Sequence, residues 1–428
     1  MRFFIALFSL TTLLLALPFS IIKHETSTRE GPTLFVIGGI HGNEPGSYFA
    51  ASILSEYYTI TKGNLWVIPN LNHESIMMNN RGVNGDMNRK FADIDMDDSD
   101  FPIVDELKKI IVDPQVDLIL NLHDGHGFYR KAYQNTIFNP GAWGQTCVID
   151  QISLDSDHIY KDMNKIASTV SQELNGDLIQ DHHCFDVRNT NTRFDDEAMK
   201  HSLTFFAINH NKPAFAIETS KNLPTLEEKV FYQLRAIEGY MHYMGITYTR
   251  SFELTINDLK RILNMNENVT INTNINLNLE NLRKDLSFVP LKSELNDFNF
   301  THPLGGMLKK DGKFNLYIGN RKITSLSPSL HTDIKCTDDL VLDIDEKKEN
   351  ITYAKEYFVT TDVSISNRSK TRTNFIGFTQ KGKTDESNVR VALKDFDPKY
   401  SIDNDAKIYR VEFYKKNDFC GMILIHFK

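Results

Sequence analysis

The first 250 residues alternate short apolar runs with helical patterns. Four continuous apolar runs stand out, at residues 33–40, 65–69, 116–122 and 214–217. Strands that are apolar at every position belong to a sheet covered on both faces, so this part of the chain is predicted to be an α/β domain. A long helix is predicted after Pro224, with Thr225 as its N-cap and Glu228 completing a capping box.

Beyond about residue 250, apolar and polar positions alternate strictly. The apolar side chains at Val269, Ile271, Ile275, Leu277 and Leu279 share this period of two, which predicts a half-buried strand. Similar alternations at residues 314–318, 353–359, 411–414 and 422–427 predict antiparallel hairpins. The charged stretch at residues 343–350 is expected to be a linker or loop between two small β domains.

Composition narrows the class of protein. A hydrophobic fraction of 41% with 24% charged residues excludes a disordered chain and a polytopic membrane protein. The 48 Lys and Arg residues against 56 Asp and Glu residues leave a net charge of −8, and no basic tract interleaved with aromatics stands out, which argues against nucleic acid as a partner. At ~150 residues per domain, 428 residues indicate about three domains.

The chain begins with the features of an export signal. Arg2 is followed by an almost uncharged apolar run to Phe19. An uncleaved N-terminal anchor is the alternative, because residues 3–22 match the ~20 residues that span a bilayer. Either form places the body of the protein outside the cytoplasm.

The four cysteines are widely spaced and form no C-x-x-C motif: Cys147, Cys184, Cys336 and Cys420. This spacing argues against a thiolate zinc site and an iron–sulfur cluster. At most two disulfides can form, and the sequence leaves their pairing open.

Three of the apolar runs end in residues capable of catalysis. His41 and Glu44 follow the run that ends at Ile40, His123 follows Leu122, and Glu218 follows Ile217. Ligands collect at the carboxyl ends of strands in open α/β sheets. Two imidazoles and one carboxylate are a common ligand set for catalytic zinc, which leaves Glu218 free to act as a general base.

Each of these assignments has a plain structural alternative. An H-x-x-E match is expected by chance about once in such a chain, so His41 could cap a loop and Glu44 could be a helix charge. His126 is the rival of His123, which has the more rigid strand support. The pair at residues 182–183 lies in polar sequence and is predicted to be on the surface.

A second informative segment runs from Arg81 to Phe91 and contains Asn88 and Arg89. A planar guanidinium beside an amide can grip a carboxylate, and a second arginine can meet an oxyanion. An enzyme that cuts next to a terminal carboxylate needs both. The alternative is a glycine-rich loop with solvated charges.

In their order along the chain, these residues resemble the zinc carboxypeptidase family, including its aspartoacylase-like branch. The motifs at residues 38–46, 120–125 and 217–220 look most like the periplasmic peptidoglycan D,L-carboxypeptidases that maintain helical cell shape. The resemblance covers residues 31–248. It implies a carboxypeptidase-like mixed sheet covered by helices, followed by two small, mainly antiparallel β domains.

The resemblance also implies a role for each site residue. One zinc ion would be held by His41, Glu44 and His123. Glu218 would be the general base and acid, Arg81 the oxyanion stabiliser, and Asn88 with Arg89 the clamp on the terminal carboxylate of the substrate. The tyrosine that digestive members place near the scissile bond has no assignable position here.

The activity that the resemblance implies is periplasmic trimming of peptidoglycan tripeptide stems to dipeptides, with release of terminal meso-diaminopimelate and an effect on cell shape. Two alternatives are an aspartoacylase-like amidohydrolase of small N-acyl amino acids, against which the export signal argues, and a non-catalytic envelope protein that binds peptidoglycan. The expected division is a signal peptide at 1–20, the zinc carboxypeptidase domain at 21–248, a small β domain at 249–342 and a β-sandwich-like domain at 343–428. The last two would contact envelope protein partners.

Overall fold

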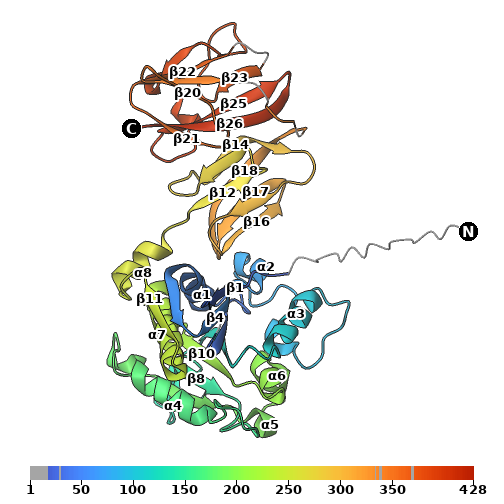
Figure 1. The fold of residues 1–428 in the computed structure, drawn as a ribbon, viewed down its shortest axis with the longest axis vertical. Helices are drawn as coiled ribbons and strands as arrows, with labels where there is room; N and C mark the ends of the chain where they lie inside the picture. Colours follow the sequence, from blue (N-terminus) through green and yellow to red (C-terminus); the bar gives the residue numbers. More distant parts are fainter. Residues whose placement is uncertain (1–17, 28–29, 333, 337–339, 368–370) are drawn as a thin grey trace, which may run out of the picture.

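The computed structural model describes residues 18–27, 30–332, 334–336, 340–367 and 371–428. Three blocks of structure follow one another along the long axis of the molecule: an α/β block, a middle β block and a C-terminal β block (Figure 1). The predicted export signal lies almost entirely outside the described residues. Within the described ranges, the structure has no helix with the length and apolar character needed to cross a membrane.

A seven-stranded mixed sheet forms the centre of the α/β block, in the order β1-β4-β2-β5-β10-β8-β9. Its parallel centre consists of β2 (Thr33–Ile37), β4 (Asn64–Ile68), β5 (Leu118–Gly125) and β10 (Ala214–Ser220). Its outer strands are β1 (Ile22–Glu25), β8 (Thr146–Ile149) and β9 (Asp186–Asn189). The first three central strands are buried at every position, as the apolar runs predict.

Helices cover both faces of this sheet (Figure 1). One group packs together and consists of α1 (Pro45–Tyr57), α4 (Met163–Leu174) and α7 (Leu226–Met244), while α3 (Phe101–Ile111) and α6 (Leu203–Asn209) lie on the other face. Helix α7 begins as predicted, because the Thr225 side chain accepts the N–H of Glu228. Gly245 ends it with a φ of 73°.

Shorter elements complete this block. They are α2 (His73–Met77), α5 (Thr192–Asp195), α8 (Ile256–Leu263), the paired strands β3 (Tyr58–Lys62) and β11 (Thr247–Arg250), and β6 (Phe128–Tyr129) with β7 (Phe138–Asn139).

Each β block contains two sheets. The middle block has β13 (Ile275–Asn278), β12 (Asn268–Ile271) and β15 (Phe298–Phe300) in one sheet, and β14 (Asp285–Lys292), β18 (Arg321–His331), β17 (Lys313–Ile318) and β16 (Gly305–Lys310) in the other. One sheet of the C-terminal block consists of β20 (Lys347–Asn350), β19 (Val341–Ile344), β22 (Asp362–Ser366) and β24 (Arg390–Ala392). The other sheet consists of β21 (Glu356–Val359), β26 (Asp418–Phe427), β25 (Ile408–Lys415) and β23 (Thr371–Phe375). Most neighbouring strands are antiparallel, as expected.

Three predictions for the β region are wrong. The alternation at residues 353–359 predicts an antiparallel hairpin, but its strand β21 pairs with β26 in parallel. The alternating run near residue 270 is a hairpin of β12 and β13 rather than one strand, because Asn272 and Thr273 take left-handed φ values of 52° and 63° and reverse the chain. The supposed linker at 343–350 is the hairpin of β19 and β20, which turns at Asp345 and Glu346 with φ values of 48° and 68°.

One disulfide joins Cys336 to Cys420 and ties the start of the C-terminal block to β26. Cys147 and Cys184 are free thiols.

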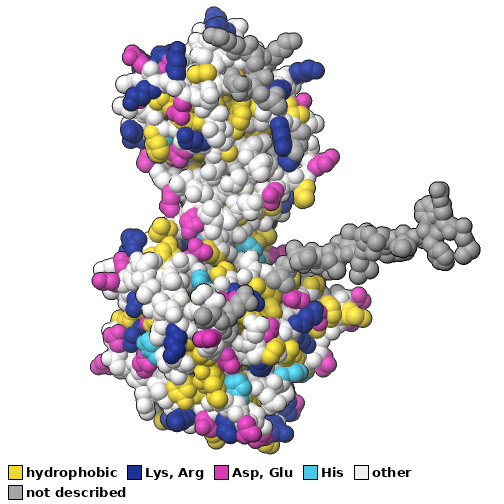
Figure 2. Space-filling view, in the orientation of Figure 1, with side chains coloured by type: hydrophobic (Ala, Val, Ile, Leu, Met, Phe, Trp, Pro, Cys, Tyr) yellow, Lys and Arg dark blue, Asp and Glu magenta, His cyan; other side chains and the backbone are white. Residues whose placement is uncertain are grey.

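Charges of both signs are interspersed over all three blocks on the face shown in Figure 2. With a net charge of −8, the field of the whole protein does not favour an anionic substrate. Recognition of a carboxylate must therefore rest on local groups.

Candidate metal centre and active site

A cleft of about 240 Å³ opens at the carboxyl ends of β5 and β10. It is lined by all seven residues singled out from the sequence: His41, Glu44, Arg81, Asn88, Arg89, His123 and Glu218. His126 also lines the cleft but is exposed and lies outside the group formed by His41, Glu44 and His123, which could hold a metal ion and is called the metal-binding group below. The topology therefore brings His41 and Glu218, which are 177 positions apart in the sequence, into one site.

The loop after β2 is shaped to present His41 and Glu44. Gly39 has a φ of 77°, and a Cβ atom at Gly42 would lie only 2.0 Å from the carbonyl carbon of Ser75. The backbone approach to α2 at this point therefore requires glycine. Glu44 occupies the N-cap position of α1 but makes no capping hydrogen bond, so its carboxylate is available to the cleft.

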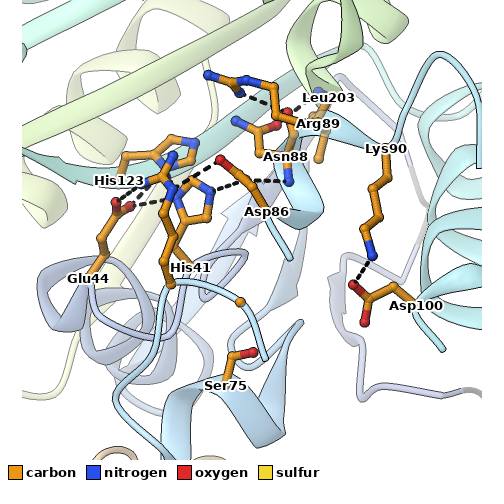
Figure 3. Close-up of polar contacts among 12 residues, drawn as sticks. His41, Glu44, Ser75, Asp86, Asn88, Arg89, Lys90, Asp100, His123 and Leu203 are labelled. Carbon is orange, nitrogen blue, oxygen red and sulfur yellow. Dashed lines mark hydrogen bonds and ion pairs between the residues drawn. The ribbon is translucent and has the colours of Figure 1, made fainter. Parts of the chain in front are cut away.

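Three donor atoms converge in the cleft. Glu44 Oε2 lies 3.1 Å from His41 Nδ1 and 2.9 Å from His123 Nδ1, and the two Nδ1 atoms are 3.2 Å apart (Figure 3). All three side chains are buried. Ligands at about 2.1 Å from a tetrahedral zinc ion are about 3.4 Å from one another, so this triangle fits zinc with little adjustment.

Asp86 belongs to the segment from Arg81 to Phe91, but the sequence alone assigned it no role. Its Oδ1 lies 2.8 Å from His41 Nε2 (Figure 3). Its Oδ2 accepts the Nε–H of Arg81 at 3.0 Å. A carboxylate on the far nitrogen of a histidine fixes the tautomer that exposes the other nitrogen to a metal. Its place between Arg81 and Asn88 in the motif was the available signal.

We expect Asp86→Asn to weaken zinc affinity by about 10–100-fold, because the charge that makes His41 Nδ1 a better ligand is lost. Competition with a chromophoric chelator measures this affinity. Asp95→Asn, at an exposed position, is the matched control. Equal affinity in the Asp86 and Asp95 variants would show that Asp86 does not support the metal ligand.

Glu218 lies beside the metal-binding group because β10 pairs with β5 in parallel register, Glu218 opposite His123. Burial raises the pKa of Glu218 well above its usual range, and the negative charges of Glu44 and Asp124 raise it further. A carboxylate with a raised pKa is a stronger base than an exposed one. Gly125 leaves it room, since a Cβ there would lie 2.7 Å from Glu218 Oε2.

Asn88 and Arg89 also line the cleft. Asn88 Oδ1 accepts the N–H of Leu203 at 3.0 Å, which leaves the amide NH₂ group as a donor. Arg89 Nη1 donates to the Asn88 carbonyl at 2.9 Å, and its Nη2 contacts the Met199 sulfur at 3.4 Å. Most of the five N–H donors of the guanidinium therefore remain for a ligand.

Two further residues were not singled out from the sequence. The buried Asp124 accepts the Gly46 N–H at 2.8 Å and the Thr219 hydroxyl at 2.5 Å, which joins the start of α1 to β10. Lys221 Nζ lies 3.4 Å from Glu44 Oε1 and adds positive charge to the cleft.

The prediction that both histidines at 182–183 lie on the surface is wrong for His183. It is 1% exposed, lies 3.0 Å from the Tyr232 hydroxyl and stacks on Phe128. Burial lowers the pKa of His183 to about 4. The partners come from distant segments, so its polar local sequence did not reveal them.

A mixed sheet with a buried His–Glu–His group at its carboxyl edge, a neighbouring glutamate and arginines defines a metallocarboxypeptidase. The chain belongs to the family of carboxypeptidases controlling helical cell shape: the model of the catalytic part of this family matches residues 3–264. A second model, for the C-terminal domain of metallo-carboxypeptidases, matches residues 334–428.

Among solved structures, the apo form of the cell shape determinant Csd4 from Helicobacter pylori is 33% identical, with a TM-score of 0.91 over 96% of this chain and 100% of that one. Its tripeptide-bound form matches equally well. The mDAP-bound form of the same protein, described as a D,L-carboxypeptidase, is 33% identical with a TM-score of 0.90 over 95% of this chain and 100% of that one. A search of curated proteins finds no match.

Proposed function

We propose that this protein is a zinc-dependent D,L-carboxypeptidase that acts in the periplasm on peptidoglycan tripeptide stems, releasing terminal meso-diaminopimelate and leaving dipeptides. The observation that carries the proposal is a metal-binding group and a carboxylate clamp in one cleft. Support comes from full-length similarity to Csd4, whose structures include tripeptide-bound and mDAP-bound forms.

Substrate orientation depends on the clamp. The Asn88 amide and the Arg89 guanidinium would bind the terminal carboxylate of the stem, which places the last amide bond near Glu218. Because the bound carboxylate fixes the position of the substrate, the attack on the neighbouring amide becomes a nearly unimolecular step.

The residues His41, Glu44 and His123 would hold the zinc ion, which when bound supplies Lewis acidity that lowers the pKa of water from ~16 toward ~7. Glu218 takes the proton from the attacking water. Arg81 stabilises the negative charge that develops on the former carbonyl oxygen. Glu218 then donates its proton to the leaving amine, which completes the cleavage.

The same proposal covers the division of the chain. Residues 1–20 would direct export, and the α/β block, which extends through α8 to Leu263, would cut the stem. The two β blocks, which divide before β19 begins at Val341, would contact the cell envelope, including protein partners.

The experiment that tests the function is digestion of a purified tripeptide muropeptide, followed by chromatography and mass spectrometry. We expect a dipeptide product and free meso-diaminopimelate. A tripeptide whose terminal carboxylate is amidated should be cut at least tenfold more slowly, since a charge-assisted hydrogen bond contributes about 1.5–3 kcal/mol. Binding of the muropeptide without cleavage would instead support the non-catalytic alternative, and cleavage only of small N-acyl amino acids would support the aspartoacylase-like one.

A further inference from the structure

A second cleft, of about 350 Å³, lies between the middle and C-terminal β blocks. The middle block contributes Phe288 from β14 and Ser329 from β18. The C-terminal block contributes residues from β23, β25 and the segments next to them. These strands lie far from the metal-binding group along the long axis of the molecule (Figure 1). The proposed reaction uses none of these residues.

The charges in this cleft cancel. Arg410 and Glu412 are the charged side chains among the described residues of its lining, and their exposed fractions are 4% and 2%. Arg410 Nε lies 3.4 Å from Glu412 Oε1, and the Tyr414 hydroxyl also donates to Glu412. The cleft therefore offers no net charge, which disfavours a stem peptide with free carboxylates and favours a neutral, polar ligand.

Phe288 is held outward by this buried arginine. Arg410 donates to the carbonyls of Ser287 and Phe288 at 3.0 and 3.2 Å. Phe288 has a φ of 55°, in a bulge of β14, and its side chain is 70% exposed. A bulky residue in this left-handed region is an outlier that persists only when surrounding structure enforces it. Exposing an aromatic ring in this way adds nothing to the core, so a role in binding accounts for it.

Other residues in the cleft add aromatic and polar groups beside the ring of Phe288. Tyr400 is 41% exposed. Asn374 Oδ1 is buried and has no hydrogen-bond partner, so it needs a donor that a ligand can supply. The polar residues Ser329 and Thr379 line the same space. Aromatic faces carry partial negative charge and attract the polarised C–H faces of pyranose rings, while amide and hydroxyl groups bind the sugar substituents.

We propose that this cleft binds the glycan strand of peptidoglycan, a neutral chain of N-acetylated amino sugars. The choice of this polymer rests on the proposed function, whereas the class of ligand rests on the cleft alone. Glycan binding between the β blocks holds the enzyme on the wall while the metal-binding cleft processes stems.

The test is calorimetric titration of the full-length protein with an N-acetylglucosamine tetramer, which is uncharged. We expect the tetramer to bind, and Phe288→Ala and Tyr400→Ala each to weaken binding at least tenfold. Phe288→Tyr should retain it. Phe358→Ala is the matched control, because Phe358 is a phenylalanine that is 55% exposed on β21 of the C-terminal block but lies outside the cleft. Melting curves check that each variant is folded.

Failure of the wild type to bind the tetramer, or equal losses of binding in Phe288→Ala and Phe358→Ala, would overturn the proposal. Binding of a free tripeptide that Phe288→Ala removes would assign the cleft to peptides and would also overturn it. Cleavage of free tripeptide is measured in parallel and should be the same in Phe288→Ala and wild type. A wild type that binds glycan but cuts no tripeptide would contradict the proposed function and leave the glycan site standing.

Discussion

Glu218→Gln is expected to lower the kcat for tripeptide cleavage by about 10³–10⁴, within the upper range of general acid–base contributions. The amide has the shape of the carboxylate but cannot take a proton from water. The structure suits Glu218 to this role, because burial raises its pKa well above the usual range and its strand places it beside His123. Release of meso-diaminopimelate, followed by chromatography, measures the rate.

Zinc content and KM should change little in this variant, since Glu218 is outside the group of three donor atoms. Glu197→Gln is the matched control, because Glu197 is an exposed carboxylate whose side chain is 88% accessible. If Glu218→Gln keeps more than a tenth of the wild-type kcat with zinc bound, another group is the base.

Much of the catalytic fold can be predicted from local pattern. Three of the central strands are buried at every position, and a strand that is covered on both faces is recognised in the sequence as a nearly continuous apolar run. The polar residue that ends each strand then falls at the same edge of the sheet, which brings His41, His123 and Glu218 together. Their roles in catalysis remain predictions that the variants test.

The supporting residues depend on contacts between distant segments and could not be predicted in the same way. Asp86 acts on His41 from 45 positions away, and Asp124 reaches Thr219 across 95 positions. His183 is buried only because Phe128 and Tyr232 surround it. No local sequence pattern indicates which of these distant residues will come into contact.

The errors in the β region have a different cause. Strand β20 is exposed at all four positions, so it has no apolar alternation and its sequence is that of a charged loop. Its pairing with β19 comes from backbone hydrogen bonds, which do not require apolar side chains. Asn272 and Thr273 turn the chain without glycine or proline, so the reversal between β12 and β13 carried no strong turn signal.

Arg81→Met is expected to lower kcat by about 10²–10³, the usual effect of removing one donor to a developing oxyanion. In the structure, Arg81 Nη1 donates to Glu44 Oε1 at 3.1 Å and its Nε to Asp86 at 3.0 Å. These two carboxylates hold the guanidinium at the metal-binding group, although its side chain is 44% exposed. Arg81→Lys keeps the charge but loses the planar fork and should recover only part of the rate.

A comparison of Arg81→Met with Arg89→Met distinguishes the proposed roles of the two arginines. A donor that acts only on the transition state lowers kcat, whereas a clamp that also binds the ground state raises KM. We therefore expect Arg81→Met to change mainly kcat and Arg89→Met to change KM as well, as steady-state kinetics on the tripeptide would show. Zinc content is measured in both variants, because Arg81 touches a metal-binding residue and Arg89 does not. Full zinc occupancy in Arg81→Met with an unchanged kcat would transfer the oxyanion role to another group, for which Lys221, 3.4 Å from Glu44, is the nearest cation in the cleft after Arg81.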